Sequence, residues 1–243
     1  MSSIYDFNAL ISAVDVDFRD IIKPSGLLRH MQEAGNAHFR EMGGGYEKLT
    51  GANMAFILTR VVMTLPGNIR YFDTVHIRTW HQGHKGPYFT RNYEFLVNHQ
   101  ISGRATTLWV LLDTAQKRVL RPSALPFDIP SLPERGSGLD ISRIEFPADM
   151  PKTGGRPVYY SDIDHYQHMN NTVYADICCD FLPGGVKGLE GRRVARFDIT
   201  YHAEAAAGDT LDIFAVERAG SAYVRGMRGD KKSFEARMEF DGV

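Results

Sequence analysis

The chain has few of the features that place a protein in a membrane or outside the cell. Its two cysteines, Cys178 and Cys179, are adjacent. Neighbouring alpha carbons lie about 3.8 Å apart, below the usual range for a disulfide, so we expect reduced thiols. No apolar run approaches the roughly 20 residues of a transmembrane helix, and residues 1–15 lack the basic and apolar segments of a secretory leader. These absences predict a cytoplasmic protein with no membrane span.

An excess of charge of one sign is also missing. The formal net charge is -1, so the chain as a whole has no field that attracts nucleic acid or an anionic membrane. No nucleic-acid partner is therefore expected. With 243 residues, the chain is long enough to bury a large core without disulfides, as one large domain or as two small ones.

Proline is scarce except in one segment. Seven of the eleven prolines lie between Pro122 and Pro157, around the polar run 134–138. Because proline-rich polar sequence resists both helices and sheet ladders, we predict a linker at residues 131–157. The linker would separate an N-terminal domain, residues 1–130, from a C-terminal domain, residues 158–243.

On each side of this linker, one helical pattern precedes several strand-like runs. In the first half Ser25 can cap a helix that Gly43 stops, and in the second half Asn170 or Asn171 can cap a helix that Pro183 stops. Each helix has an apolar stripe wide enough to be wrapped by a sheet. The apolar residues at helical spacing are Leu27, Leu28, Met31, Ala34, Phe39 and Met42 in the first helix, and Val173, Tyr174, Ile177, Cys178 and Phe181 in the second.

The runs that follow each helix alternate between apolar and polar residues, as half-buried strands do. They include 89–95, 106–112 and 234–240, and without helices between them they predict antiparallel sheet. Four residues recur 136 positions later: Arg60, Thr64, Asp73 and Thr74 fall on Arg196, Thr200, Asp209 and Thr210. We therefore predict an α+β tandem (double) hotdog fold, with a curved antiparallel sheet around a long helix in each half. The alternative is a chance repeat in an unrelated α+β protein.

The segment 161–171, which runs into the second helix, has the densest set of reactive side chains. Its sequence is SDIDHYQHMNN, with two acids and two histidines beside a helix start. The free amides and partial positive charge of such a start suit a developing oxyanion. Two other interpretations are open at this point. One is a polar turn in which Asp164 and Asn170 cap locally, and the other is a metal site made of Asp162, Asp164, His165 and His168.

This segment resembles the signature of the plant and bacterial acyl-acyl carrier protein (acyl-ACP) thioesterases, which reads approximately S-D-L-D-x-N-x-H-V-N-N. The resemblance extends to 109–122, similar to a strand of that family with a tryptophan near its start, and to 201–204, similar to its Y-x-x-E-C segment. Two positions depart from the family pattern. Tyr166 stands where the motif has asparagine, and Ala205 stands where the cysteine follows the glutamate, so a cysteine nucleophile is impossible at that position.

The resemblance implies hydrolysis of fatty acyl-ACP to free fatty acid and holo-ACP, with no cofactor and no metal. It implies that Asp164 and His168 are catalytic and that Glu204 faces them from a neighbouring strand. Tyr166, Asn170 and Asn171 would position the substrate or its oxyanion at the helix entrance. A thioesterase needs a base that activates water, or a carboxylate that attacks directly. Which acid has which role stays open, and so does the choice between a monomer and a homodimer.

The first half serves as an internal control. At offsets of 144 to 146 residues the counterpart of His168 would be Pro24, Lys23 or Ile22, none of which can replace an imidazole. We therefore expect the N-terminal domain to be non-catalytic and to hold the acyl chain. The remaining histidines have no acid within two positions in sequence and are expected to be structural or exposed; they include His30, His38, His76, His81, His84 and His99.

Three other functions are compatible with these residues. The carrier could be coenzyme A, the protein could bind acyl groups without catalysis, or it could be a hotdog hydratase or dehydratase, which also uses an acid and a histidine. Acyl carrier protein is acidic, so a basic surface beside the site would favour it as the partner. Arg192, Arg193 and Arg196 lie near Glu204 in sequence and are candidates for that surface.

Overall fold

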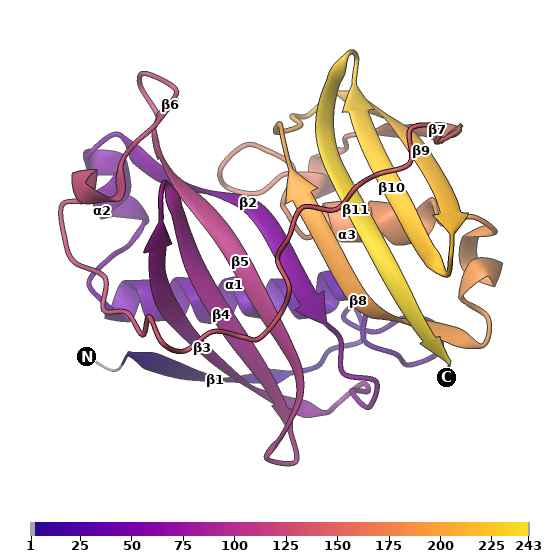
Figure 1. The fold of residues 1–243 in the computed structure, drawn as a ribbon, viewed down its shortest axis with the longest axis horizontal. Helices are drawn as coiled ribbons and strands as arrows, with labels where there is room; N and C mark the ends of the chain where they lie inside the picture. Colours follow the sequence, from indigo (N-terminus) through magenta and orange to yellow (C-terminus); the bar gives the residue numbers. More distant parts are fainter. Residues whose placement is uncertain (1–2, 243) are drawn as a thin grey trace.

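The computed structural model describes residues 3–242, in which 11 strands form one antiparallel sheet (Figure 1). The strand order is β1-β3-β4-β5-β2-β8-β11-β10-β9-β7, and the short β6 pairs with β5. The strands are β1 Ile4–Leu10, β2 Met54–Thr64, β3 Thr74–Lys85, β4 Tyr88–Val97, β5 Gln100–Asp113, β6 Arg118–Val119, β7 Lys152–Pro157, β8 Arg192–Tyr201, β9 Thr210–Arg218, β10 Ser221–Arg228 and β11 Lys231–Gly242. The α-helices are α1 Pro24–Glu41, α2 Tyr46–Gly51 and α3 Val173–Asp180.

The two halves of the sheet repeat one topology. The order β1-β3-β4-β5-β2 in the first half corresponds to β7-β9-β10-β11-β8 in the second, and the halves join where β2 pairs with β8. In that pair Arg60 lies opposite Thr200 and Thr64 lies opposite Arg196. Residues that are equivalent by the 136-residue repeat therefore face each other in reverse order, as a local two-fold axis requires. The predicted repeat and its antiparallel sheet are confirmed.

The first half wraps its sheet around α1. On β4 the alternating residues Arg91 and Tyr93 point toward this helix: Arg91 Nη1 lies 3.0 Å from His38 Nδ1, and the Tyr93 hydroxyl would lie 2.9 Å from a Cβ atom at Gly35. Only glycine allows so close an approach between helix and strand. The concave face of the sheet and the apolar stripe of the helix thus close on each other, as the sequence predicts.

The start of α1 differs from the prediction. Lys23, not Ser25, is the N-cap residue, and Pro24 occupies the first turn, where its missing N–H costs no hydrogen bond. Ser25 is fully buried inside the helix, and its hydroxyl donates to Asp176 of α3. The serine therefore connects the helices of the two halves rather than capping one of them.

The helix of the second half covers most of its predicted apolar spacing but is not long. α3 has 8 residues, whereas α1 has 18, so the expectation of a long helix in each half is wrong for the C-terminal half. The helix ends at Asp180, before Leu182 and Pro183, because proline lacks the N–H of a helical residue and disfavours helical conformation in the residue before it. Thr172, not an asparagine, is the N-cap residue.

The predicted linker, residues 131–157, ends in a strand that the sequence pattern did not show. β7 lies within it and pairs with β9 as the outer strand of the second half. Two glycines and a proline hide this strand in the sequence, and an edge strand tolerates them because one side of its ladder is free. The irregular part of the connection ends before Lys152 and runs along the outside of the sheet (Figure 1).

The two halves share one hydrophobic core. The same cluster of buried side chains includes Ile77 and Phe95 from the first half and Phe197 and Phe234 from the second. A smaller aromatic cluster lies at the far end of α1, where Phe39 meets the sheet. Within residues 3–242, no helix combines the length and the apolar character that crossing a membrane needs.

Candidate functional site

The segment before α3 folds into a tight turn that brings Asp164 next to His168. The Asp164 amide donates to the His168 carbonyl at 3.1 Å, and the Gln167 amide donates to the Asp164 carbonyl at 2.9 Å. Gln167 has a φ of 67°, and Ile163 and Met169 form an isolated bridge that closes the loop. The local sequence therefore builds a closed loop that presents both predicted catalytic residues from its ends.

Both oxygens of the Asp164 carboxylate accept hydrogen bonds. Oδ1 accepts the Tyr166 amide at 2.9 Å, and Oδ2 accepts Nδ2 of Asn170 at 3.0 Å. The Asn170 carboxamide oxygen in turn accepts the amide and the hydroxyl of Thr172. This chain of bonds fixes the orientation of the Asn170 side chain at the entrance of α3.

His168 and Glu204 form the second pair of the site. His168 Nε2 lies 3.0 Å from Glu204 Oε2, and the side chains are 43% and 53% exposed, so water and a substrate can reach both. The Met169 amide donates to the Ala205 carbonyl at 2.8 Å and ties the loop to the segment after β8. The structure thus brings an imidazole and a carboxylate together from positions 36 residues apart.

The other predicted positions have more limited contacts. Tyr166 is half exposed, and its ring lies 3.8 Å, centroid to centroid, from that of His165. Asn171 accepts the Tyr201 hydroxyl through its backbone carbonyl at 2.9 Å. The Thr172 and Val173 amides already donate to Asn170, so these two are occupied, and the binding of an oxyanion by helix-start amides stays a prediction.

No thiol takes part in this arrangement. Ala205 is fully buried, and its amide donates to the Tyr174 hydroxyl at 3.2 Å. Burial, followed by the charge of the neighbouring Cys179, raises the pKa of Cys178 well above its ordinary value. Burial also raises the pKa of Cys179 to about 12, with further contributions from Asp176 and Asp180. Both cysteines are therefore thiols at neutral pH.

The acids and histidines of the loop do not converge as metal ligands. The Asp162 carboxylate is bound at 2.7 Å by both terminal nitrogens of Arg156. Burial acts to raise the pKa of Asp162, but the hydrogen bonds from Arg156 and the Tyr159 amide bring it below its ordinary value. In the described part of the chain, no three His, Cys, Asp or Glu side chains cluster as metal ligands would.

The arginines predicted to flank the site lie elsewhere. Arg192 and Arg193 begin β8, whereas Glu204 follows its other end, and a strand of this length at about 3.3 Å per residue spans roughly 30 Å. Arg192 is paired with Glu217, Arg193 with Asp241 and Arg196 with Asp198. The expected basic surface beside Glu204 is therefore not formed by these residues.

The loop 16–22 of the first half is equivalent to the loop 163–169 of the second. The bridge Val16–Ile22 matches the bridge Ile163–Met169, an offset of 147 rather than 144 to 146. The counterpart of His168 is therefore Ile21, not Pro24, Lys23 or Ile22. Ile21 is 5% exposed and has no group that can exchange a proton, so the conclusion drawn from the sequence is unchanged.

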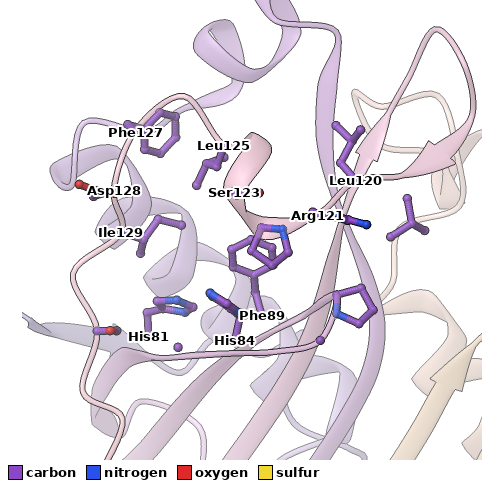
Figure 2. A pocket seen from close by; sticks show the side chains of 16 residues that line it. His81, His84, Phe89, Leu120, Arg121, Ser123, Leu125, Phe127, Asp128 and Ile129 are labelled. Atoms are coloured by element: carbon purple, nitrogen blue, oxygen red, sulfur yellow. The ribbon is translucent and has the colours of Figure 1, made fainter.

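Two pockets differ in size and in the kinds of residues that line them. One, of about 1040 Å³, lies in the first half between the β3–β4 hairpin and the segment after β6; Figure 2 shows Phe89, Leu125, Phe127 and Ile129 around it, with His81 and His84 at its base. Burial first, and then the charge of Arg91, lower the pKa of His81 to about 4. The other pocket, of about 400 Å³, is lined by Asn170 and Thr172 together with α1.

Comparison with known proteins gives the family. Residues 3–124 match the model of the acyl-ACP thioesterase N-terminal domain and residues 149–241 match that of the C-terminal domain. Dodecanoyl-[acyl-carrier-protein] hydrolase of Cinnamomum camphora is 23% identical over 81% of this chain and 55% of its own length. Oleoyl-acyl carrier protein thioesterase 1 of Arabidopsis thaliana is 27% identical over 75% of this chain and 55% of its own length. The chain thus spans about half the length of these curated relatives.

Solved structures agree in fold. An acyl-ACP thioesterase from Bacteroides thetaiotaomicron superimposes with a TM-score of 0.89 at 20% identity, over 99% of this chain and 100% of that one. The 12:0-ACP thioesterase from Umbellularia californica superimposes with a TM-score of 0.83 at 17% identity, over 100% and 99% of the two chains. The tandem hotdog fold is confirmed, and because each half matches its own family domain, the chain belongs to the acyl-ACP thioesterase family.

Proposed function

We propose that this protein hydrolyses the thioester of a fatty acyl-ACP and releases the free fatty acid and holo-ACP. The observation that carries the proposal is the exposed pair of His168 and Glu204, at 3.0 Å, beside a loop in which Asp164 fixes Asn170. The curated relatives are named as hydrolases of dodecanoyl-ACP and oleoyl-ACP, which supports the same substrate class here.

In the proposed mechanism His168 takes a proton from the attacking water. The Glu204 carboxylate orients the imidazole and stabilises the imidazolium that forms. The water oxygen adds to the thioester carbonyl carbon, the carbon–sulfur bond then breaks, and the leaving thiolate recovers the proton. A thiol with a pKa near ~8.5 is a good leaving group and needs little further acid catalysis.

Asp164 and Asn170 have positioning roles in this proposal. A carboxamide nitrogen has two N–H donors, and one of those on Asn170 goes to Asp164. We assign the second to the carbonyl oxygen of the substrate, where a fixed donor stabilises the developing negative charge. Both Asp164 oxygens already accept hydrogen bonds, so we prefer this role to direct attack by Asp164. Tyr166 and Asn171 shape the entrance around the bound thioester.

In this proposal the two halves have different roles. The C-terminal half carries the reacting groups, and the N-terminal half holds the acyl chain, as predicted for residues 158–243 and 1–130. The lining of the large pocket supports this division, because Leu120, Leu125 and Ile129 form an apolar part of it that an alkyl chain could contact. Neither a cofactor nor a metal has a place in this chemistry. Cytoplasmic localisation and a monomeric or homodimeric state stay predictions.

The test is release of thiol from acyl-ACPs of several chain lengths, compared with the same acyl groups on coenzyme A. Wild-type protein should release free acid, and His168→Ala should lower kcat by about 10³-fold, in the range of lost general base catalysis. Asp164→Asn should lower kcat by only about tenfold if Asp164 positions Asn170. A loss with Asp164→Asn as large as that with His168→Ala would instead make Asp164 the reactive carboxylate.

Three results would point to the alternative functions. Faster turnover on coenzyme A esters would change the carrier but keep the hydrolysis. Saturable binding of the acyl thioester without free acid would make the protein an acyl-binding protein. A change in enoyl absorbance without thiol release would identify a hydratase or dehydratase.

A further inference from the structure

The polar pocket beside the candidate site is built by both halves of the chain. Asn170 and Thr172 contribute from the start of α3, and Arg29, His30 and Gln32 contribute from one face of α1. Asn170 is also the residue that Asp164 holds. A group that fills this pocket therefore lies against the other side of the residue assigned to the thioester carbonyl.

His30 is held in this wall by a buried carboxylate. Its Nε2 lies 3.1 Å from Asp15 Oδ2, and the Asp15 side chain is 4% exposed. Asp15 also accepts the amide and hydroxyl of Ser12, and Arg29 lies 3.4 Å from its second oxygen. When the Nε2–H group of His30 donates to Asp15, the other ring nitrogen, Nδ1, takes part in no hydrogen bond among residues 3–242. Nδ1 is therefore available to a ligand.

His30 and Gln32 have no equivalent side chains in the second half. At the 147-residue offset, the counterpart of His30 is Ile177, which is fully buried, and the counterpart of Gln32 is Cys179. The counterpart of Arg29 is Asp176, which is polar but accepts the Ser25 hydroxyl of α1. The histidine and the glutamine are thus present beside the loop that has His168 and missing beside the loop that has Ile21.

We propose that this pocket binds the pantetheine arm of the substrate, with His30 and Gln32 as hydrogen-bonding partners of its amide groups. The inference rests on the proposed thioester hydrolysis. An alkyl chain in this pocket would leave the second ring nitrogen of His30 and the carboxamide of Gln32 without partners and out of water, which is unfavourable. An arm with two amides and a hydroxyl provides donors and acceptors for them. A pocket of about 400 Å³ is also within the usual range of small-molecule sites.

The experiment compares one acyl group on three thiols: ACP, pantetheine alone, and 2-mercaptoethanol, which lacks the amides. We expect His30→Leu to raise KM about tenfold for the first two esters, the effect of one or two lost hydrogen bonds. The KM for the mercaptoethanol ester should stay unchanged, and kcat should change less than about twofold for all three. His30→Gln, which keeps a hydrogen-bonding group, should restore much of the affinity.

His76→Leu is the matched control. His76 is also paired with a carboxylate, Asp6 at 2.8 Å, but it lies at the outer β1–β3 ladder and lines neither pocket. Its substitution should leave all three KM values unchanged. If His30→Leu does not fold, Gln32→Leu tests the same wall without touching Asp15, and it should give the same selective rise in KM.

Two kinetic results would overturn the inference. If His30→Leu and Gln32→Leu raise KM equally for all three esters, the pocket holds the acyl group and not the arm. If neither changes any KM, the pocket binds no part of the substrate. Should the wild-type protein hydrolyse no ester, the proposed function fails, and calorimetry with a non-hydrolysable acyl-pantetheine thioether decides the inference separately. Binding that His30→Leu weakens would uphold it, and no binding would overturn it.

Discussion

The loops that precede the two central helices are the same turn with different side chains. In the first half the Asp17 amide donates to the Ile21 carbonyl at 2.8 Å, and in the second the Asp164 amide donates to the His168 carbonyl at 3.1 Å. Oδ1 of each aspartate accepts the amide two residues later. The position after that, Asp20 or Gln167, has a positive φ of 60° or 67°.

The turn itself forms without a catalytic histidine. Asp17 makes the same turn as Asp164 in a loop without a histidine, so the backbone bonds of Asp164 are no sign of catalysis. The differences are Ile21 against His168, Lys23 against Asn170 and, by the 136-residue offset, Asn68 against Glu204. The proposed chemistry of the second half therefore depends on three substitutions within a shared backbone frame.

The largest effect is expected when the second loop receives the residues of the first. His168→Ile and Glu204→Asn place in the second half the side chains that the first half has at Ile21 and Asn68. Each change should lower kcat by about 10²- to 10³-fold, and the double variant should be little worse than His168→Ile alone, because the two residues act as one unit. Thiol release measures kcat, and circular dichroism checks the fold.

The fold should survive these changes, because the first loop keeps the same backbone bonds with isoleucine at that position. Multiplicative losses in the double variant would show that His168 and Glu204 act independently. That result would contradict the proposed pair even if both residues were needed for activity.

A smaller effect, on stability rather than activity, is expected at the third residue of each turn. In the first loop this residue is Arg19, whose guanidinium pairs with Asp17 at 2.6 Å and donates to the carbonyls of Leu189 and Arg192 in the other half. In the second loop it is Tyr166, which is 47% exposed. The first loop thus uses this position to hold the two halves together, whereas the second has a half-exposed tyrosine there.

Arg19→Ala should therefore lower the free energy of unfolding by about 2 kcal/mol, as expected for lost hydrogen bonds from a charged group. Tyr166→Ala should change it by less than about 0.5 kcal/mol, as exposed substitutions usually do. Urea denaturation of the two variants gives both values. Equal losses would mean that the third position has the same structural role in both loops.

Much of this fold could be predicted from the sequence because its signals are local. Period-two alternation marked β4, β5 and β11, and identities such as Arg60 with Arg196 marked the repeat. The motif placed Asp164 and His168 in one turn, since both belong to the same short segment. The pairing of His168 with Glu204 was expected only through the resemblance, because no local pattern shows which strand end meets which loop.

The features that were missed depend on contacts between distant segments. His30 and Asp15 meet across a loop, and Ser25 turns toward Asp176, although neither partner is adjacent in sequence. The apolar spacing of the second half covers only 173–181, which matches α3 with its C-cap residue Phe181, and the expectation of a long helix went beyond that spacing. Spacing shows which face of a segment is apolar, but it does not show where its backbone pairing stops.

The smallest effect is expected at the two cysteines, whose counterparts in the first half are Met31 and Gln32 at the 147-residue offset. Because burial raises the pKa of Cys178 well above its ordinary value and that of Cys179 to about 12, almost no thiolate is present at pH 8. Iodoacetamide at that pH should leave thioester hydrolysis unchanged, and Cys179→Ser should keep kcat within about twofold. Rapid inactivation of the wild type, with protection in Cys179→Ser, would place a reactive thiol in the second half. The difference between the two halves would then extend beyond His168 and Glu204 into the helix that follows them.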